Sequence, residues 1–165
     1  MTAMRVFPAL LALALAACAS LDVGFGVQPG VTSAEEVVRL KGPPAVEIAN
    51  PDGSKNMAYP RGYFSGQTFM VHVGRDGLVQ NVEQVLTDDR FYRIVPGITR
   101  EDVLRLIGPP IETMEFPRLQ QVAWEYRYRD SWGYDAFLSV MIDRQGIVAG
   151  RTTRRIDRGN DNRSR

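Results

Sequence analysis

The fold is decided by the stretch PGITREDVLRLIGPP, which occupies residues 96–110. Its apolar residues recur at three- and four-residue spacing, as they do on one face of a helix. Thr99 precedes this run and has Asp102 three positions later, a weaker form of the capping box that begins helices. Gly108 is followed by two prolines, which cannot continue a helix. The stretch therefore predicts a short helix that ends at Gly108.

A second copy of this stretch, PGVTSAEEVVRLKGPP, occupies residues 29–44. The offset is 67 residues at the Pro-Gly and 66 at the Gly-Pro-Pro, so the first copy carries one extra residue. Thr32 and Glu35 have the spacing of a capping box. The similarity returns further along the chain, where residues 69–79 match residues 138–148. These matches predict that one unit is duplicated in tandem.

Alternating apolar residues follow each predicted helix, which is the pattern of strands with one buried face. Turns at Gly77 and Gly146 are expected to close hairpins. The sequence thus predicts an α+β fold with two repeats, residues 29–92 and 93–156, each a short helical segment followed by an antiparallel β-meander. One unit buries little surface alone, so we expect the two to share a sheet or a core. The clearest strand pattern is formed by Val122, Trp124, Tyr126 and Tyr128, and we expect Trp124 to be buried.

The N-terminus has the features of a bacterial lipoprotein signal. Arg5 is followed by an apolar run that ends in Leu-Ala-Ala-Cys18 and is too short to cross a bilayer. Cys18 is the only cysteine of the chain, and its setting resembles the lipobox in which the thiol takes a diacylglyceryl group. We predict a signal peptide at residues 1–17, a lipid on Cys18 and a linker at residues 18–28. The alternative is an ordinary signal with a chance cysteine. Ala19 follows the cysteine, and the resemblance then implies sorting to the outer membrane and an anchor that faces the periplasm.

The composition argues against a nucleic-acid binder. The chain has 20 Lys and Arg against 19 Asp and Glu, and removal of Arg5 with the signal makes the two numbers equal. With 44% hydrophobic and 24% charged residues the chain is typical of a globular protein. Residues 157–165 contain no apolar residue and predict a disordered basic tail. Such a tail is either solvated or touches anionic head groups and acidic partners.

The repeated residues resemble the SmpA/OmlA family of small outer-membrane lipoproteins, whose BamE-like members serve the β-barrel assembly machinery. The resemblance covers nearly all of the chain after the signal. In the second repeat it rests on Gly97, Thr99, Val103, Gly108, Pro110, Trp124, Tyr126 and Gly146. In the first repeat it rests on Gly30, Thr32, Val37, Gly42, Pro44, Tyr59 and Gly77. The BamE-like proteins have one unit, so the duplication is a departure, and the tandem form looks like that of β-lactamase inhibitory proteins.

The resemblance implies two functions of different classes. The first is an outer-membrane-anchored periplasmic lipoprotein that acts as a binding or scaffold module in envelope and outer-membrane protein assembly. Its partners would be the membrane, through the lipid on Cys18, and an envelope protein such as the β-barrel assembly machinery. The alternative is a proteinaceous inhibitor that blocks a periplasmic enzyme such as a β-lactamase-like hydrolase. A lipid anchor favours the first function, because many inhibitors act free in solution.

No catalytic constellation is visible in the sequence. His72 is the only histidine and lies in the middle of a predicted strand. With one histidine and a lipidated cysteine, neither a zinc cluster nor a Cys–His pair can be built. Asp88 and Asp89 precede Arg90 in a polar linker, where a solvated pair is a simpler interpretation than a catalytic one. The sequence therefore predicts a protein that is not an enzyme and binds no cofactor or metal.

The candidate partner-binding residues are aromatic and lie in two glycine-punctuated segments, RGYFSG at residues 61–66 and DSWGYD at residues 130–135. Glycine and polar neighbours predict surface loops between strands. A large aromatic side chain in such a loop either folds back onto the sheet or is presented to a partner. Tyrosine and tryptophan are enriched at binding hot spots, which supports the second interpretation. The candidates are Tyr63, Phe64, Trp132 and Tyr134.

Overall fold

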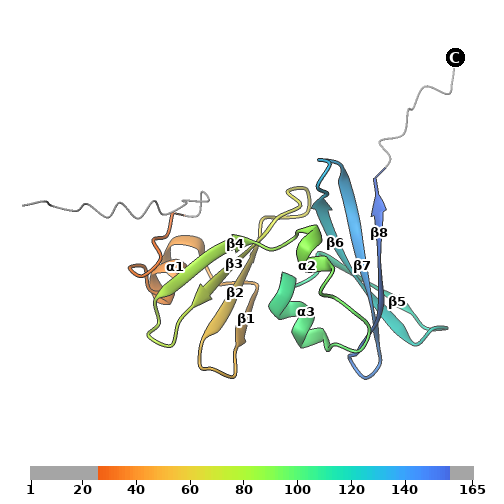
Figure 1. Ribbon diagram of the computed structural model, residues 1–165, viewed down its shortest axis with the longest axis horizontal. Coiled ribbons are helices and arrows are strands. Elements are labelled where there is room, and N and C mark those ends of the chain that lie inside the picture. The colour runs from red at the N-terminus through yellow and green to blue at the C-terminus, as the bar shows by residue number, and fades with distance from the viewer. Residues whose placement is uncertain (1–25, 157–165) are drawn as a thin grey trace, which may run out of the picture.

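The computed structural model describes residues 26–156 of the chain (Figure 1). The predicted signal peptide, the lipidated residue Cys18, most of the linker and the tail at 157–165 lie outside the described residues. Within 26–156, no helix is long and apolar enough to cross a membrane.

Residues 26–156 form eight strands in two separate antiparallel sheets, each with its strands in chain order. Sheet 1 consists of β1 (Val46–Ala49), β2 (Lys55–Pro60), β3 (Thr68–Val73) and β4 (Val79–Gln84). Sheet 2 consists of β5 (Glu112–Phe116), β6 (Gln121–Arg129), β7 (Asp135–Asp143) and β8 (Val148–Arg155). The helices in this part of the chain are α1 (Ala34–Lys41), α2 (Asp88–Phe91) and α3 (Arg100–Ile107).

The predicted α+β class, with two helix-plus-meander units that could share one sheet, is wrong. The protein is mostly β, because its helices hold only 8, 4 and 8 residues while the strands form two distinct four-stranded sheets. Two causes explain the error. Gly42 and Gly108 end α1 and α3 after about two turns, at φ angles of 81° and 78°. In addition, the sequence pattern gave no sign of the short edge strands β1 and β5.

The start of α1 differs from the predicted capping box. Ser33 is the N-cap, and its hydroxyl accepts a hydrogen bond from the backbone N–H of Glu36. The hydroxyl of Thr32 instead accepts from the N–H of Gln28, so the pairing of Thr32 with Glu35 is wrong. In α3 the predicted capping box between Thr99 and Asp102 is present. Ser33, not Thr32, therefore corresponds to Thr99, and the extra residue of the first copy lies before the helix.

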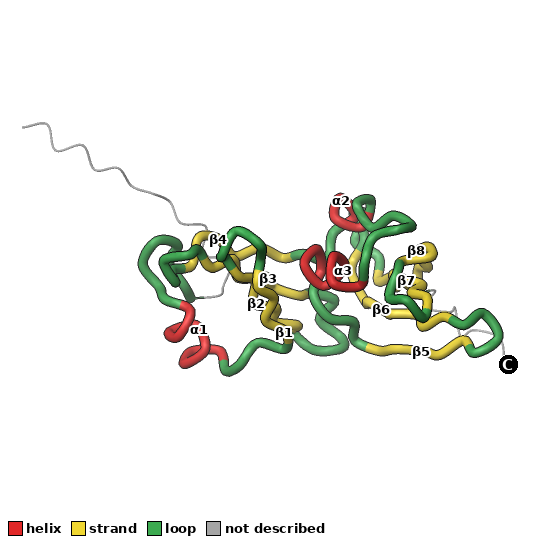
Figure 2. The backbone as a smooth tube through the Cα atoms, turned by 90° about the horizontal axis from the view of Figure 1, so that it is seen from below, coloured by secondary structure: helices red, strands yellow, loops and turns green. Residues whose placement is uncertain are grey.

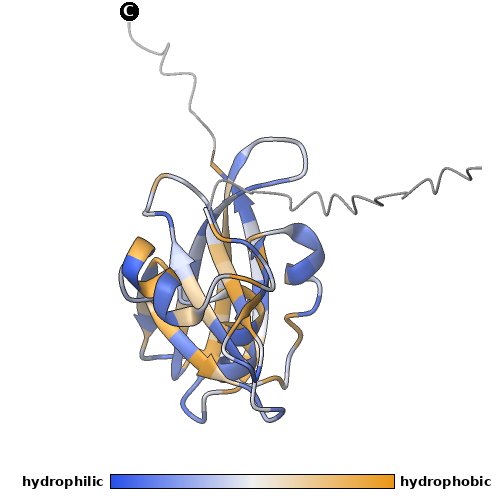
Figure 3. Cartoon of the chain, turned by 90° about the vertical axis from the view of Figure 1, so that its left-hand side faces the viewer, coloured by the Kyte–Doolittle hydropathy of each residue, from blue (hydrophilic) through white to orange (hydrophobic). Residues whose placement is uncertain are grey.

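The elements stack in four layers along the long axis of the molecule, in the order α1, sheet 1, α3, sheet 2 (Figures 1 and 2). The first core lies between α1 and the front face of sheet 1, where Val37 packs with Met57 and Val71. The second core lies between the two sheets. It joins the back face of sheet 1 (Ala58 and Met70) to α2, α3 and the front face of sheet 2. Seen from the α1 end, apolar strands fill the centre and polar turns surround them (Figure 3).

Candidate functional site: an aromatic surface on two adjacent loops

The four candidate aromatic residues lie on two loops, one between β2 and β3 and the other between β6 and β7. All four side chains are exposed, with fractions of 43% for Tyr63, 82% for Phe64, 78% for Trp132 and 58% for Tyr134. The structure therefore does not fold these rings back into a core. We call this set of four residues the aromatic surface.

The two loops are held together through the end of β6. A side-chain carbon on Gly66 would lie 3.2 Å from the Cα atom of Tyr128, so the first loop approaches the β6 backbone more closely than other residues allow. Arg127 lies beneath this loop, with its guanidinium 5.8 Å from the ring centre of Tyr63 and 5.3 Å from that of Phe64. The aromatic surface is thus supported by a cation from the other half of the chain.

Arg127 is itself fixed in place. Its Nη2 atom lies 3.2 Å from a carboxylate oxygen of Asp135, and both side chains are largely buried. The rings of Tyr63 and Phe64 meet edge to face, with their centres 5.0 Å apart. The ion pair thus holds a cation against two aromatic rings that also contact each other.

The second loop is shaped by one carboxylate, that of Asp130. One of its oxygens accepts backbone hydrogen bonds from Trp132 at 3.0 Å and Tyr134 at 2.9 Å, while the other accepts from Arg155 at 2.7 Å. Desolvation alone would raise the pKa of this carboxyl, but the Tyr134 N–H and the Arg155 guanidinium outweigh it, and the pKa is lowered. Asp130 therefore stays charged at neutral pH, and the loop keeps its shape.

A further contact ties the second loop to α2. The carboxylate of Asp88 accepts a hydrogen bond from the backbone N–H of Ser131 at 3.1 Å. The prediction that Asp88 and Asp89 form a solvated pair in a linker is therefore incomplete, because both lie in α2. Arg155 also lies over the ring of Tyr134, 4.8 Å from its centre.

Sequence reasoning identified the exposed rings but missed the residues that hold them. Asp130 was detectable, because an aspartate at the start of a glycine-containing loop typically accepts hydrogen bonds from the next backbone N–H groups. Arg127 was not detectable from the sequence, because the rings that it contacts belong to Tyr63 and Phe64. These residues lie 64 and 63 positions earlier in the chain. The structure gives no contact between Trp132 and the first loop.

Two other residues singled out in the sequence serve the fold. His72 is half-buried on the back face of sheet 1, where its ring nitrogens lie 2.9 Å from Asn56 Oδ1 and 2.6 Å from Glu83 Oε1. Trp124 is partly buried and packs against the core between the sheets. Its burial is thus less complete than expected.

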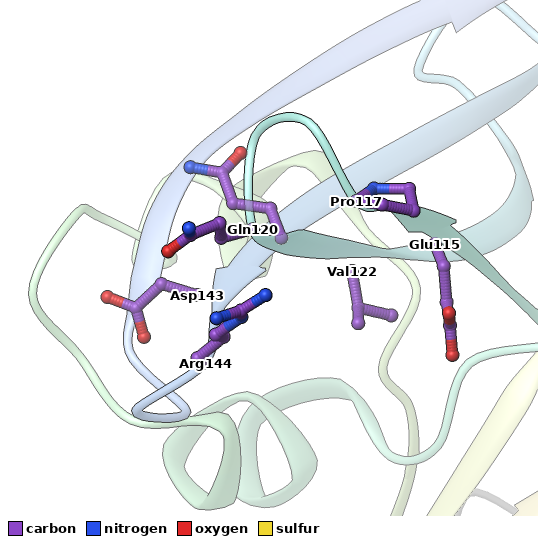
Figure 4. Close-up of a pocket in the computed structure, with 7 residues that line it drawn as sticks. Glu115, Pro117, Gln120, Val122, Asp143 and Arg144 are labelled. Carbon is purple, nitrogen blue, oxygen red and sulfur yellow. The ribbon is translucent and has the colours of Figure 1, made fainter.

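One hollow lies away from the aromatic surface, at the turn end of sheet 2 (Figure 4). Its volume is about 180 Å³, and its lining includes Glu115, Gln120 and Arg144. Asp143 also lines it, but one of its carboxylate oxygens already accepts the backbone N–H groups of Gln145 and Ile147. Among the described residues, no group of three or more His, Cys, Asp or Glu could hold a metal ion.

Comparisons with known proteins leave the family of the chain open. No family model matches it, and no curated protein matches it. Among solved structures it is similar to a DUF4309 family protein (YjgB) from Bacillus subtilis, with 12% sequence identity over 79% of this chain and 83% of that chain. The TM-score is 0.31, and a similarity of this size carries no argument about fold or function.

Proposed function

We propose that this protein is a lipid-anchored binding module of the bacterial envelope and that the aromatic surface contacts a protein partner. The observation that carries the proposal is the exposure of Tyr63, Phe64, Trp132 and Tyr134 on loops fixed by ion pairs and hydrogen bonds. Soluble proteins seldom expose large rings together without using them in recognition. Loops that are already held in place lose little conformational entropy when a partner covers them.

The location of the module is proposed from the sequence. The Leu-Ala-Ala-Cys18 motif resembles a lipobox, and the repeated residues resemble the SmpA/OmlA family. Together they support an outer-membrane lipoprotein whose described part lies in the periplasm and assists the assembly of envelope proteins. The lipid is tested by labelling with palmitate. The wild type should incorporate the label and Cys18→Ser should not, so label on Cys18→Ser would contradict the anchor.

The binding role is tested by crosslinking in the intact envelope. A photoreactive residue at Trp132 or Phe64 should crosslink to one envelope protein, which mass spectrometry then identifies. Trp132→Ala and Phe64→Ala should weaken capture of that protein by roughly tenfold, which corresponds to about 1.4 kcal/mol of binding free energy. Their thermal melting should be nearly unchanged, because the rings are exposed.

A matched control is available in Tyr92, an aromatic residue that is 70% exposed on the segment between α2 and α3. Tyr92→Ala should leave capture unchanged. Equal loss of capture in Tyr92→Ala, or wild-type capture by Trp132→Ala and Phe64→Ala together, would contradict the aromatic surface as the contact site. Crosslinking to the catalytic cleft of a periplasmic hydrolase would favour the inhibitor function instead.

A further inference from the structure

Sheet 1 has a polar hollow on the part of its back face that lies beyond the contact with α3. Ala58 and Met70 are cross-strand neighbours where α3 packs, and Asn56 and His72 are the next pair on the same face, two residues along β2 and β3. The hollow has a volume of about 440 Å³, within the range of about 300–1,000 Å³ for small-molecule sites. We propose that it binds a neutral oligosaccharide through its amide side chains. The proposal does not depend on the aromatic surface.

The equivalent row of sheet 2 shows that the fold does not require polar groups at this place. Tyr59 and Tyr126 make equivalent hydrogen bonds in the two sheets, so Asn56, three residues before Tyr59, corresponds to Ala123. Along this row of cross-strand neighbours, sheet 1 has Asn56, His72 and Asn81 where sheet 2 has Ala123, Met141 and Gly150. In both sheets the row lies next to a shift of register. Because sheet 2 forms the row from apolar and small residues, the polar row of sheet 1 needs another explanation.

A chain of hydrogen bonds fixes the polar groups of the hollow. The hydroxyl of Ser54 donates to Asp52 at 2.6 Å, so its oxygen accepts from Asn50 Nδ2 at 3.0 Å. The same Asn50 nitrogen donates to Asn56 Oδ1 at 3.3 Å, and His72 Nδ1 lies 2.9 Å from that oxygen. Asn56 Oδ1 is therefore the acceptor for both neighbours. Within residues 26–156 the Nδ2 group of Asn56 forms no hydrogen bond, so it can donate to a ligand in the hollow.

Further amides line the hollow from other elements. Asn81 and Gln80 on β4 are exposed, and Asn50 belongs to the turn between β1 and β2. Each amide offers both donors and an acceptor, and each hydroxyl group of a sugar likewise donates and accepts. A second hollow of about 340 Å³ shares Ser54 and Gln80 with the first. The two hollows are therefore adjacent, which favours a chain of sugar units over a single one.

The charge and polarity of the lining favour a neutral, hydroxyl-rich ligand. Its titratable residues are His72 and Glu83, and Glu83 is already ion-paired with Arg90 of α2. Among the described residues that line the hollow there is no arginine or lysine, the side chains that bind phosphate and carboxylate groups. Val73 alone is apolar there, and it is 1% exposed. The lining thus offers little cover for the apolar side chains of a peptide, whereas sugar hydroxyl groups can pair with the amides.

The test uses the full mature chain in a detergent whose head group is not a sugar. Cello-, malto- and N-acetylchito-oligosaccharides are titrated into isotope-labelled protein, and NMR follows the side-chain amide signals of Asn56 and Asn81. At least one of these neutral oligosaccharides should shift both signals in a saturable manner. Galacturonate oligomers of the same length should bind at least roughly tenfold more weakly, because the lining has no arginine or lysine to pair with their carboxylates.

Variants separate binding from folding. Asn81→Ala changes an exposed side chain, so it should keep the melting temperature of the wild type and raise the Kd roughly tenfold. The triple variant Asn56→Ala, His72→Met, Asn81→Gly copies the row of sheet 2 and should abolish binding. If the triple variant does not fold, Asn81→Ala still decides the question. Gln145→Ala, at an exposed amide in the turn between β7 and β8, is the control and should bind like the wild type.

Three results would overturn the proposal. The first is that none of the neutral oligosaccharides shifts the signals of Asn56 and Asn81 at millimolar concentration. The second is that the galacturonate oligomers bind as tightly as the neutral ones, or that Asn81→Ala binds like the wild type. The third is that the shifts are confined to the aromatic loops, which would place the sugar on another surface of the molecule.

Discussion

Sheet 1 and sheet 2 share a local design but differ in what covers them. In each sheet a tyrosine of the second strand donates a hydrogen bond to the carbonyl of the glycine that ends the packed helix. Tyr59 donates to Gly42 at 3.2 Å, and Tyr126 donates to Gly108 at 3.0 Å. Sheet 1 is nevertheless covered by a helix on both faces, α1 and α3, while within residues 26–156 sheet 2 is covered by helices on its front face alone. The difference shows that two sheets with the same local hydrogen bond to a helix end can differ in how much of their surface is buried.

The residues of the two back faces reflect this difference. Sheet 1 has Ala58 beside Met70 where α3 packs. At the corresponding cross-strand pair, sheet 2 has Glu125 beside Ser139. Polar residues on an uncovered face keep it soluble, as the outward faces of terminal repeats do in stacked proteins. Two methionines, Met114 and Met141, lie on the same face of sheet 2, two residues along their strands from the row that contains this polar pair.

The largest expected difference between the sheets concerns their methionines. Met70 is fully buried between the layers, and Met141 is half-buried on the open face. Met70→Ala should reduce the free energy of unfolding by about 2–5 kcal/mol, because it leaves a cavity. Met141→Ala should cost less than about 1 kcal/mol. Chemical denaturation, performed at a concentration where the protein is monomeric, compares the two. Equal losses would mean that sheet 2 is covered on both faces.

The glycines that end the helices give the next largest effect. Both have a φ near 80° and an extended ψ, so alanine should introduce similar backbone strain of about 1–3 kcal/mol at either position. Gly108→Ala should cost about 1–3 kcal/mol more, because its new methyl would lie 3.2 Å from the Cβ of Ala58. Differences in melting temperature between the two variants measure this extra term. A Gly42→Ala variant as unstable as Gly108→Ala would argue against the close inter-layer contact.

The tyrosine hydrogen bonds should respond in the same order. Tyr126 is 1% exposed, and removal of its hydroxyl leaves the carbonyl of buried Gly108 without a partner. We expect Tyr126→Phe to cost about 1–3 kcal/mol. Tyr59→Phe should cost less than about 1 kcal/mol, because Gly42 is half-exposed and water can replace the hydroxyl. The comparison fails if the two substitutions have the same effect on urea midpoints.

The smallest effect is a dependence of stability on pH that belongs to sheet 1. Burial would raise the pKa of Glu83, but the hydrogen bonds and charges of Arg90 and His72 outweigh it and hold the pKa below its ordinary value of 4.5. A lowered pKa in the folded state stabilises the protein above the unfolded pKa, and this contribution is lost as pH falls through the folded value. Unfolding below pH 4.5 should therefore depend less steeply on pH in Glu83→Gln than in the wild type. Because Glu83 is one-third exposed, we expect less than about 1 kcal/mol. An unchanged pH slope would contradict this role.

Local chemistry could be predicted from the sequence because it depends on neighbours along the chain. Gly42 and Gly108, each followed by two prolines, end helices wherever they occur, since glycine accepts a positive φ and proline has no N–H to donate. The alternation around Tyr126 predicted a strand, and β6 is one. Glycine and polar residues predicted the two aromatic loops, and the rings on them are exposed. The lipobox at Cys18 also depends on contiguous residues, and it stays a prediction.

Only the tertiary structure decided how these pieces combine. Two separate sheets form, in place of a shared one, because α3 fills the space between them and packs on Ala58 and Met70 behind it. Arg127 supports Tyr63 and Phe64 because β6 ends beside Gly66, a proximity that no spacing in the sequence encodes. Local sequence fixes turns and caps through bonds between near neighbours. The cover on each sheet and the support under each loop depend on contacts between residues far apart in the chain, which exist only after the layers have packed.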